Sequence, residues 1–176
     1  MIIETERLIL RPFTLDDAER LAEICQNETI HRFTASLPYP YKLEHAISWI
    51  TKQQNGSDEC PFAAILKENN ELIGNISVRI DLRNNKGELG YFFDEPYWNN
   101  GYASEAAGAV IGYAFEELNL NKVYARHKTE NPASGRVMEK NGMKFEGVLR
   151  QELLKNGKYY DVAIRSILRE EYYVKV

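Results

Sequence analysis

The sequence ELGYFFDEPYWNNGYASEA occupies residues 88–106 and decides the fold of this chain, because it joins a predicted strand to a predicted helix. Its first part, Glu88–Phe93, is mostly apolar and aromatic, which is typical of a β-strand. From Ser104 to Leu118 nearly every position is apolar or small, so this segment predicts a buried helix. The first turn of a helix leaves main-chain N–H groups without partners, and the helix dipole favours an anion there. The loop at residues 99–104 therefore predicts a phosphate site.

Two small residues in this loop support the phosphate prediction. Gly101 permits a positive φ or a close approach of the main chain to a ligand, and Ala103 keeps bulky side chains away. A nucleotide-binding P-loop is excluded, because that motif requires lysine after its last glycine and Tyr102 follows Gly101 here. Read alone, the same spacing also fits an ordinary loop in which Ser104 caps the helix.

The flanking segments predict an α+β fold with a mixed, mostly antiparallel sheet of about seven strands and with about four helices. The predicted strands cover 8–12, 62–66, 72–80, 88–93, 122–129, 145–154 and 158–168, and the predicted helices cover 15–26, 44–54, 104–118 and 132–141. A strand, a helix and a strand in succession predict a parallel crossover that places 122–129 beside 88–93. Asn156-Gly157 predicts the tight turn of the last hairpin.

Length and composition limit the class of protein. The 176 residues are expected to form one domain, 1–176, since a core of this size buries roughly 70% of the surface of the unfolded chain. A net charge of -4 argues against direct nucleic-acid binding. Cys25 and Cys60 have no metal-ligand spacing and no neighbouring histidine cluster, so we expect neither a metal nor a disulfide framework. Glu4 and Glu6 interrupt the start of the chain and no apolar run would span a bilayer, so we expect a cytoplasmic protein that does not enter membranes.

Three blocks of sequence, in order along the chain, carry a resemblance to a known family: TERLILRPFTLDDAERL (5–21), ELGYFFDEPYWNNGYASEA (88–106) and NPASGRVMEKNGMKFEG (131–147). They resemble the GNAT superfamily, and within it the RimJ/RimL-like branch of ribosomal-protein N-terminal acetyltransferases. The loop pattern of the superfamily is Arg or Gln, two residues, Gly, one residue, and Gly or Ala. Here Trp98 stands at the first position, as is usual in this branch, before Gly101 and Ala103. The resemblance implies an acetyl-CoA-dependent N-acetyltransferase with a GNAT-type fold, whose sheet is splayed between the predicted strands 88–93 and 122–129.

The resemblance also implies which residues bind acetyl-CoA. Main-chain amides would hold the pyrophosphate at Asn100, Gly101, Tyr102, Ala103 and Ser104. Main-chain groups of Phe92 and Phe93 would pair with the pantetheine arm like an added strand, Asn131 would contact this arm, and Ser134 would lie near the thioester sulfur. Structural roles also fit two of these residues. Asn131 before a proline is a helix N-cap signal, and Ser134 is a serine of the first helical turn.

The reaction requires a neutral amine, so the pKa of the acceptor decides how much base the protein must supply. An α-amine of pKa about 7.8 is roughly a tenth neutral at pH 7, which costs about 1 kcal/mol, whereas a lysine of pKa about 10.4 costs about 4.6 kcal/mol. Glu88 is the first candidate for the general base, and a strand-edge carboxylate that holds a loop is its structural alternative. Glu152 is the second candidate, because the branch commonly carries a functional glutamate in this region. Ser134 or water would protonate the leaving thiolate.

The acceptor is less constrained by the sequence. In relatives the region between the first two predicted helices lines the acceptor cleft, which implies contacts from His31, Arg32, Tyr39 and Tyr41, and the loop at 156–160 would form the opposite wall. The leading hypothesis is direct acetyl transfer, in a ternary complex, to a protein or peptide N-terminus such as that of a ribosomal protein. The alternatives are a small-molecule amine (polyamine, amino sugar or amino acid) and a CoA-binding regulatory module without turnover. A monomer and a homodimer are both compatible.

Overall fold

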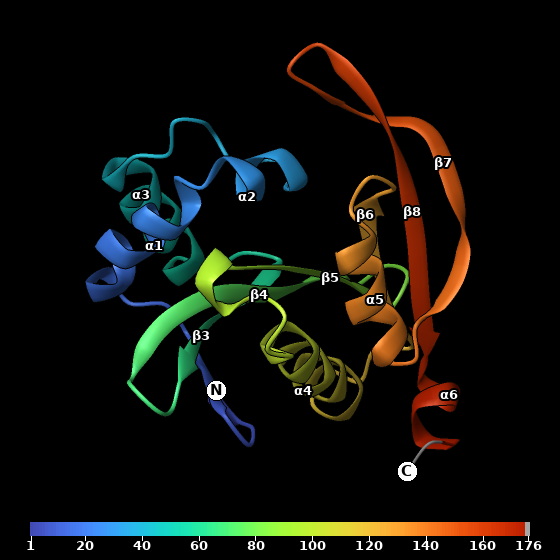
Figure 1. Cartoon of the computed structure of the whole chain (residues 1–176). Helices are drawn as coiled ribbons and strands as arrows, with labels where there is room; N and C mark the ends of the chain where they lie inside the picture. The colour runs from blue at the N-terminus through green and yellow to red at the C-terminus, as the bar shows by residue number, and fades with distance from the viewer. Residues whose placement is uncertain (175–176) are drawn as a thin grey trace.

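One mixed sheet of eight strands runs through the computed structural model of the chain, which describes residues 1–174 (Figure 1). The strands lie in the order β1-β2-β3-β4-β5-β6-β8-β7, and all neighbours are antiparallel except β5 and β6. Their bounds are β1 Ile3–Glu4, β2 Leu8–Arg11, β3 Glu59–Leu66, β4 Glu71–Asp81, β5 Lys86–Phe93, β6 Lys122–Lys128, β7 Lys144–Lys155 and β8 Lys158–Leu168.

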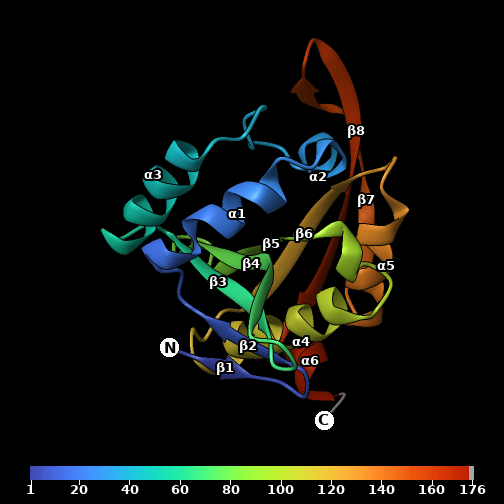
Figure 2. The same cartoon turned by 60° about the vertical axis from the view of Figure 1, so that its left-hand side comes forward.

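Helices cover both faces of this sheet (Figures 1 and 2). The α-helices of residues 1–174 are α1 Ala18–Cys25, α2 Glu28–Phe33, α3 Leu43–Gln54, α4 Tyr102–Glu116, α5 Pro132–Lys140 and α6 Arg169–Val174. Two 3-10 turns, at Leu15–Asp17 and Glu95–Tyr97, precede α1 and α4. No helix of this part of the chain has the length and apolar character needed to cross a bilayer.

Two buried clusters attach the helices to opposite faces of the sheet. Leu89 and Phe93 of β5 pack in one cluster with Phe115 of α4, and each of these side chains is at most 5% exposed. Leu21 of α1 and Ile50 of α3 belong to the second cluster, on the other face. Side chains alternate between the faces of a strand, so the odd-numbered residues of β5 face α4 and the even-numbered ones face the side of α1 to α3.

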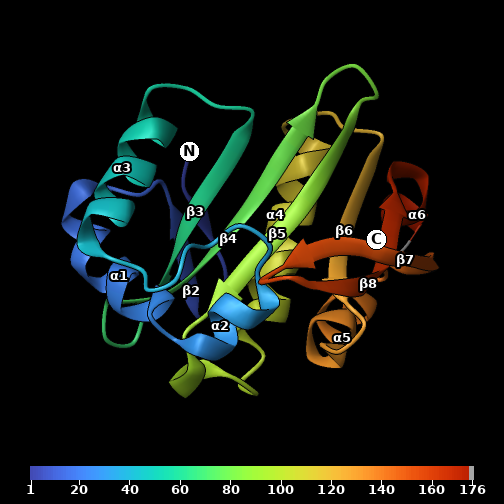
Figure 3. The same ribbon diagram turned by 90° about the horizontal axis from the view of Figure 1, so that it is seen from above.

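β5 and β6 are hydrogen-bonded only along their first halves. Their register runs from Lys86↔Lys122 to Leu89↔Ala125, and the rest of β5 has no partner in β6. Figure 3 shows the two strands diverging beyond this point. β6 continues to pair with β8 as far as Lys128. The predicted splay between these two strands is therefore confirmed.

The predicted fold class is confirmed, and three short elements add to the predicted ones. β1 brings the number of strands to eight rather than about seven, and α2 and α6 bring the helices to six rather than about four within residues 1–174. Such short segments give no readable hydrophobic period. In α2 the start signal is local, because the Asn27 side chain accepts hydrogen bonds from the N–H groups of Thr29 and Ile30.

Candidate active site

Gly101 begins the helix that follows the quoted loop. It is the N-cap of α4 with φ of 84°, a left-handed conformation that glycine adopts without strain. The first main-chain hydrogen bond of α4 runs from the N–H of Glu105 to the carbonyl of Gly101, at 3.0 Å. Within residues 1–174 no group accepts from the main-chain N–H of Tyr102, Ala103 or Ser104. These three free donors at a helix N-terminus fit a diphosphate.

Arg7 of the N-terminal segment adds a positive charge to this loop. Its Nη1 donates to the carbonyl of Asn100 at 2.9 Å, its Nε donates to Glu105 at 2.7 Å, and its guanidinium lies 4.5 Å from the Tyr102 ring centre. Nη2 lies 3.4 Å from the position that a Cβ at Gly101 would take. Sequence reasoning missed Arg7, although it lies in the first block of the resemblance.

Glu105 fastens the start of α4 to the N-terminal strands. Its carboxylate accepts from the Thr5 hydroxyl at 2.6 Å and from the main-chain N–H of Arg7 at 2.8 Å, besides the guanidinium. Partial burial acts to raise the pKa of Glu105, but these hydrogen bonds outweigh it and hold the pKa below its usual value. The start of α4 is therefore anchored by residues that lie 98 and 100 positions away in the chain.

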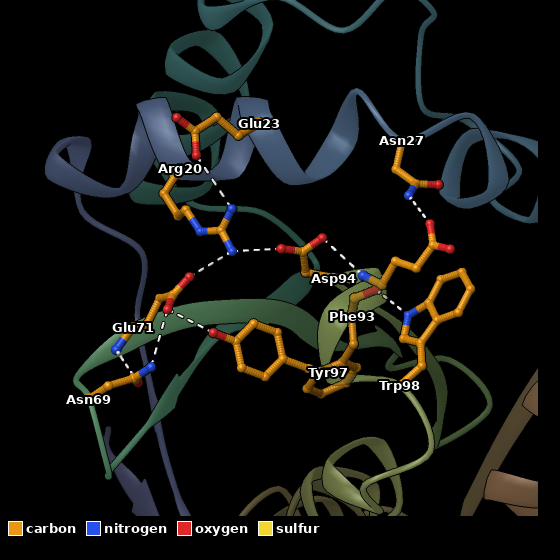
Figure 4. Close-up of polar contacts among 10 residues, drawn as sticks. Arg20, Glu23, Asn27, Asn69, Glu71, Phe93, Asp94, Tyr97 and Trp98 are labelled. Carbon is orange, nitrogen blue, oxygen red and sulfur yellow. Dashed lines mark hydrogen bonds and ion pairs between the residues drawn. The ribbon is translucent and has the colours of Figure 1, made fainter.

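A second network holds the segment that enters the loop (Figure 4). Nη2 of Arg20 in α1 donates to Asp94 at 2.6 Å and to Glu71 of β4 at 2.8 Å. The Tyr97 hydroxyl donates to the same Glu71 at 2.7 Å, and Asn27 donates to Glu95 at 2.6 Å. These contacts tie α1 and β4 to residues 94–97, so the loop is positioned by tertiary contacts as well as by its own sequence.

The hydrogen-bonding direction of β5 decides which main-chain groups face the open side of the splay. The N–H of Asp94 donates to the carbonyl of Ile73 in β4 at 2.8 Å, and this direction alternates along a strand. Phe92 therefore points its main-chain groups at β4, and Tyr91 and Phe93 point theirs at the open side. The carbonyl of Phe93 accepts from the Trp98 indole at 2.6 Å, also drawn in Figure 4. Main-chain pairing with pantetheine stays a prediction, and the register favours Phe93 over Phe92.

Asn131 and Ser134 lie at the start of α5, where the chain passes the open end of β6. The Asn131 side chain accepts from the N–H of Ser134 at 3.3 Å, so its predicted N-cap role is confirmed. The Tyr91 hydroxyl lies 2.9 Å from both the hydroxyl and the carbonyl oxygen of Ser134. Burial raises the pKa of Tyr91 to about 12, so the phenol stays protonated. Sequence reasoning placed Ser134 but missed Tyr91.

The two candidate bases meet at one arginine on the opposite face of the sheet. Glu88 accepts from Nε of Arg126 at 2.8 Å and from the Tyr124 hydroxyl at 3.3 Å. Glu152 of β7 lies 3.9 Å from Nη1 of the same Arg126. Both oxygens of Glu88 thus already accept a hydrogen bond, and an amine would compete with Arg126 and Tyr124 for them.

Asn75 is a further polar group on this face that sequence reasoning missed. It stands directly opposite Phe92 in the β4–β5 register, and directly opposed residues share a face. The residue is 6% exposed, and its Oδ1 has no hydrogen-bond partner within residues 1–174. A buried acceptor of this kind normally has a partner, so it suits a ligand N–H.

The four predicted acceptor contacts occupy different environments. The His31 ring stacks near Tyr39 with ring centres 4.9 Å apart, and Nδ1 of His31 lies 3.0 Å from the carbonyl of Leu37. Tyr39 is exposed and donates to Glu28 at 2.9 Å. The Arg32 side chain is 61% exposed. Tyr41 is 4% exposed in the cluster of α1 and α3, which leaves little of its surface for an acceptor.

Metal ligation is not supported by the described part of the chain. Within residues 1–174 no three His, Cys, Asp or Glu side chains gather in a way that would hold an ion. The groups at the splay are instead amides, hydroxyls and ion-paired carboxylates. Such groups suit the binding of an organic phosphate and an amine.

Free main-chain donors at a helix N-terminus beside a splayed sheet suit the pyrophosphate and the pantetheine arm of acetyl-CoA, and comparison with known proteins gives the family. The Acetyltransferase (GNAT) domain family matches residues 7–144. An uncharacterized N-acetyltransferase of Bacillus subtilis, YoaA, is 35% identical, with 96% of this chain and 97% of that protein covered. The chain therefore belongs to the GNAT acetyltransferase family and is an acetyl-CoA-dependent N-acetyltransferase.

Further relatives agree with the RimJ/RimL-like branch. The ribosomal-protein-serine acetyltransferase of Escherichia coli is 37% identical over 99 residues, which cover 56% of this chain and 55% of that protein. A GNAT acetyltransferase structure from Bacillus anthracis superposes with a TM-score of 0.89 at 32% identity and covers 97% of this chain and 100% of that one. The structure of spermidine N-acetyltransferase from Vibrio cholerae, in complex with CoA and spermine, superposes with a TM-score of 0.86 at 25% identity. The match covers 96% of this chain and 99% of that one. Both ribosomal-protein and polyamine acetyltransferases are thus similar to this chain.

Proposed function

We propose that this enzyme acetylates the N-terminal α-amine of a protein or peptide by direct attack on acetyl-CoA in a ternary complex. The observation that carries the proposal is the state of Glu88, whose two oxygens already accept hydrogen bonds from Arg126 and Tyr124. A base engaged in this way suits an acceptor that is partly neutral at pH 7. The α-amine meets this condition at a cost of about 1 kcal/mol, against about 4.6 kcal/mol for a lysine.

The acetyl donor would bind at the cradle and along the open side of β5. The N–H groups of Tyr102, Ala103 and Ser104 would hold the pyrophosphate, with Asn100 and Gly101 shaping the loop. Nη2 of Arg7, which lies 3.4 Å from the position that a Cβ at Gly101 would take, would reach a phosphate oxygen held at this loop. The main chain of Phe93 and the amide of Asn131 would align the pantetheine arm. When bound, acetyl-CoA supplies the activated thioester.

The acceptor amine would approach from the face of Glu88. Asn75 Oδ1, buried on that face and without a hydrogen-bond partner within residues 1–174, suits an N–H of the amine or an O–H of a water that accompanies it. Glu88 would receive the amine proton directly or through this water. Glu152, whose carboxylate lies 3.9 Å from Nη1 of Arg126, would be the alternative base. The α-ammonium would give its first proton to Glu88, a step that needs no strong base, and the nitrogen would lose its second proton when the amide forms, in balance with the proton that the leaving thiolate takes up.

The leaving thiolate would be protonated from the side of α5. If the Tyr91 phenol donates to the Ser134 hydroxyl, the serine proton is free to point at the sulfur. A phenol has a single proton, so the alternative bond to the Ser134 carbonyl would remove this support. A thiolate of pKa about 8.5 leaves readily, so this assistance is modest.

A small-molecule amine is the second candidate. The Vibrio cholerae spermidine N-acetyltransferase has the same fold at 25% identity, which supports a polyamine as the competing acceptor class. A CoA-binding module without turnover is not favoured, given the enzyme family to which the chain belongs.

Thiol release from acetyl-CoA tests the proposal against a panel of acceptors. The panel contains a peptide with a free N-terminus, the same peptide with a blocked N-terminus and a free lysine, spermidine, an amino sugar and a free amino acid. We expect the peptide with the free N-terminus to give the highest kcat/KM. A higher value for spermidine or the amino sugar would contradict the proposed acceptor.

A further inference from the structure

Two buried lysines lie at the open end of the splay on the acceptor side. Lys128, the last residue of β6, is 3% exposed, and Lys155, the last residue of β7, is 9% exposed. Lys128 donates to the carbonyl of Arg32 at 2.6 Å, and Lys155 donates to the carbonyls of His31 and Thr34. Both ammonium groups thus hold the C-terminal turn of α2, which Figure 3 shows beside the β7–β8 turn.

Neither of these lysines forms an ion pair with a carboxylate among residues 1–174. Lys128 lies instead over the Tyr160 ring, 3.6 Å from its centre. Burial, and then the charge of Lys128, lowers the pKa of Lys155 to about 8. Buried charges are normally paired, so this part of the molecule carries positive charge that its own side chains do not neutralise.

Two exposed cations extend the positive charge to the surface. Arg32 and Lys158 are 61% and 62% exposed at their side chains, and Glu130 lies between them, 3.4 Å from Arg32 and 3.2 Å from Lys158. Glu28, at the other end of α2, accepts a hydrogen bond from Tyr39. We call Arg32, Lys128, Lys155 and Lys158 the cationic rim. Its charge exceeds that of the two neighbouring carboxylates.

The cationic rim borders the place where the acceptor would enter. Lys128 follows Arg126 by two positions in β6, so it shares the face of Arg126 and Glu88 and lies past the last β5–β6 pair. Glu130 directly precedes Asn131, the N-cap of α5. Glu130 also shows that Arg32 and Lys158 are spaced to share one carboxylate.

We infer that the acceptor of this enzyme carries a carboxylate close to its reacting amine, and that Arg32 and Lys158 of the cationic rim bind it. This inference rests on the proposed function and narrows it to peptides with Asp or Glu just after the N-terminal residue. The buried Lys128 and Lys155 hold α2 in place and add to the positive field. The same field repels spermidine, whose amines are cationic. A free amino acid presents the same chemistry through its α-carboxylate.

The test compares kcat/KM for three peptides that share an N-terminal serine and differ at the next two positions: Asp-Glu, Ala-Gln or Lys-Arg. Free serine, serine amide and spermidine complete the set. We expect the acidic peptide to exceed the neutral one by about three- to tenfold, with the basic peptide lower again, as for partly exposed charge pairs. Raising the salt concentration should reduce these ratios.

Variants link the preference to the rim. Arg32→Gln and Lys158→Gln should each lower the ratio of kcat/KM for the acidic peptide to kcat/KM for the neutral peptide toward one. Glu130→Gln should increase the preference, because it frees both cations. Lys52→Gln, at an exposed lysine of α3, is the matched control and should change no ratio.

The outcomes separate this inference from the proposed function. Equal values for acidic and neutral peptides would overturn the inference and leave N-terminal acetylation standing. Acetylation of serine over serine amide, with no peptide accepted, would support carboxylate binding and contradict the peptide acceptor. Spermidine as the best acceptor would overturn both.

Discussion

The hydroxyl of Tyr91 lies 2.9 Å from the hydroxyl of Ser134, which joins the half of β5 that does not pair with β6 to the first turn of α5. This hydrogen bond lies beyond the last β5–β6 pair, where these two strands separate. It connects a buried donor that stays protonated to the serine that the family resemblance places near the sulfur. The contact is a property of the tertiary fold, since the two residues lie on different elements.

Tyr91→Phe is expected to lower kcat by about tenfold and to leave the KM for acetyl-CoA unchanged, because it removes one proton donor without removing the ring. Ser134→Ala should have a similar effect, and the double variant should be no slower than either single variant. Tyr172→Phe is the control. It removes another tyrosine hydroxyl, which lies in α6 and donates to Glu116 of α4. Additive losses would show that the two residues act separately.

Gly101→Glu is expected to weaken acetyl-CoA binding by at least about tenfold, through strain at φ of 84° and through a negative charge at the phosphate cradle. Isothermal titration with acetyl-CoA measures this affinity. Gly56→Glu controls for strain, since Gly56 has φ of 95° in open space outside the cradle. Unchanged affinity in folded Gly101→Glu would remove the cradle assignment.

Arg20→Met should loosen residues 94–97, which lead into the loop before α4, although Arg20 itself is not proposed to contact acetyl-CoA. It removes the hydrogen bonds to Asp94 and Glu71, at a cost of about 1 to 3 kcal/mol in the free energy of unfolding. Because this network positions residues 94–97, the KM for acetyl-CoA should rise while kcat with saturating donor changes little. Urea unfolding and steady-state kinetics test the two effects. A lower kcat with unaltered KM would contradict the positioning role.

Glu88→Gln is expected to lower kcat and to leave acetyl-CoA affinity intact. The loss should be greatest at low pH, where less of the acceptor amine is neutral and a base contributes most. The measurement is the pH dependence of kcat for the wild-type enzyme and the variant. A profile of unaltered shape would exclude Glu88 as the base.

Lys155 gives the stability of the fold a defined dependence on pH. Its pKa is lowered from 10.5 to about 8 by burial, so the folded chain binds fewer protons than the unfolded chain between these values. The free energy of unfolding should therefore rise with pH in this window, by about 1 to 2 kcal/mol between pH 8 and 9.5, relative to Lys155→Met. Urea unfolding at the two pH values measures the difference. A constant or falling difference would contradict the burial of a charged Lys155.

The sequence was sufficient where the signal is local. Gly101 before a buried helix predicted the positive φ at the start of α4, and Asn131 before a proline predicted the N-cap of α5. The groups it missed act across long separations. Arg7 meets Glu105 across 98 positions, and Lys155 meets Thr34 across 121. No period or spacing reports such pairs, because they exist only after the sheet and α2 have assembled.

Glu88, the first candidate base, also has a partner that the sequence alone does not reveal. Glu88 was read correctly as a polar residue of the strand next to the splay, but its partner Arg126 lies 38 positions away on β6. The sequence offered a catalytic and a structural role for this carboxylate. The ion pair with Arg126 fits the structural role, and the pH dependence of kcat for Glu88→Gln distinguishes it from the catalytic one.

The central claim is that the acetyl group goes to an α-amine rather than to a side-chain or polyamine amine. The most direct test uses one acidic peptide that has a free N-terminus and a free lysine. The peptide reacts with acetyl-CoA in the presence of equimolar spermidine, and mass spectrometry then locates the acetyl groups. We predict a single acetyl group on the N-terminal nitrogen. Acetyl groups on the lysine, or on spermidine with the peptide unmodified, would contradict the account.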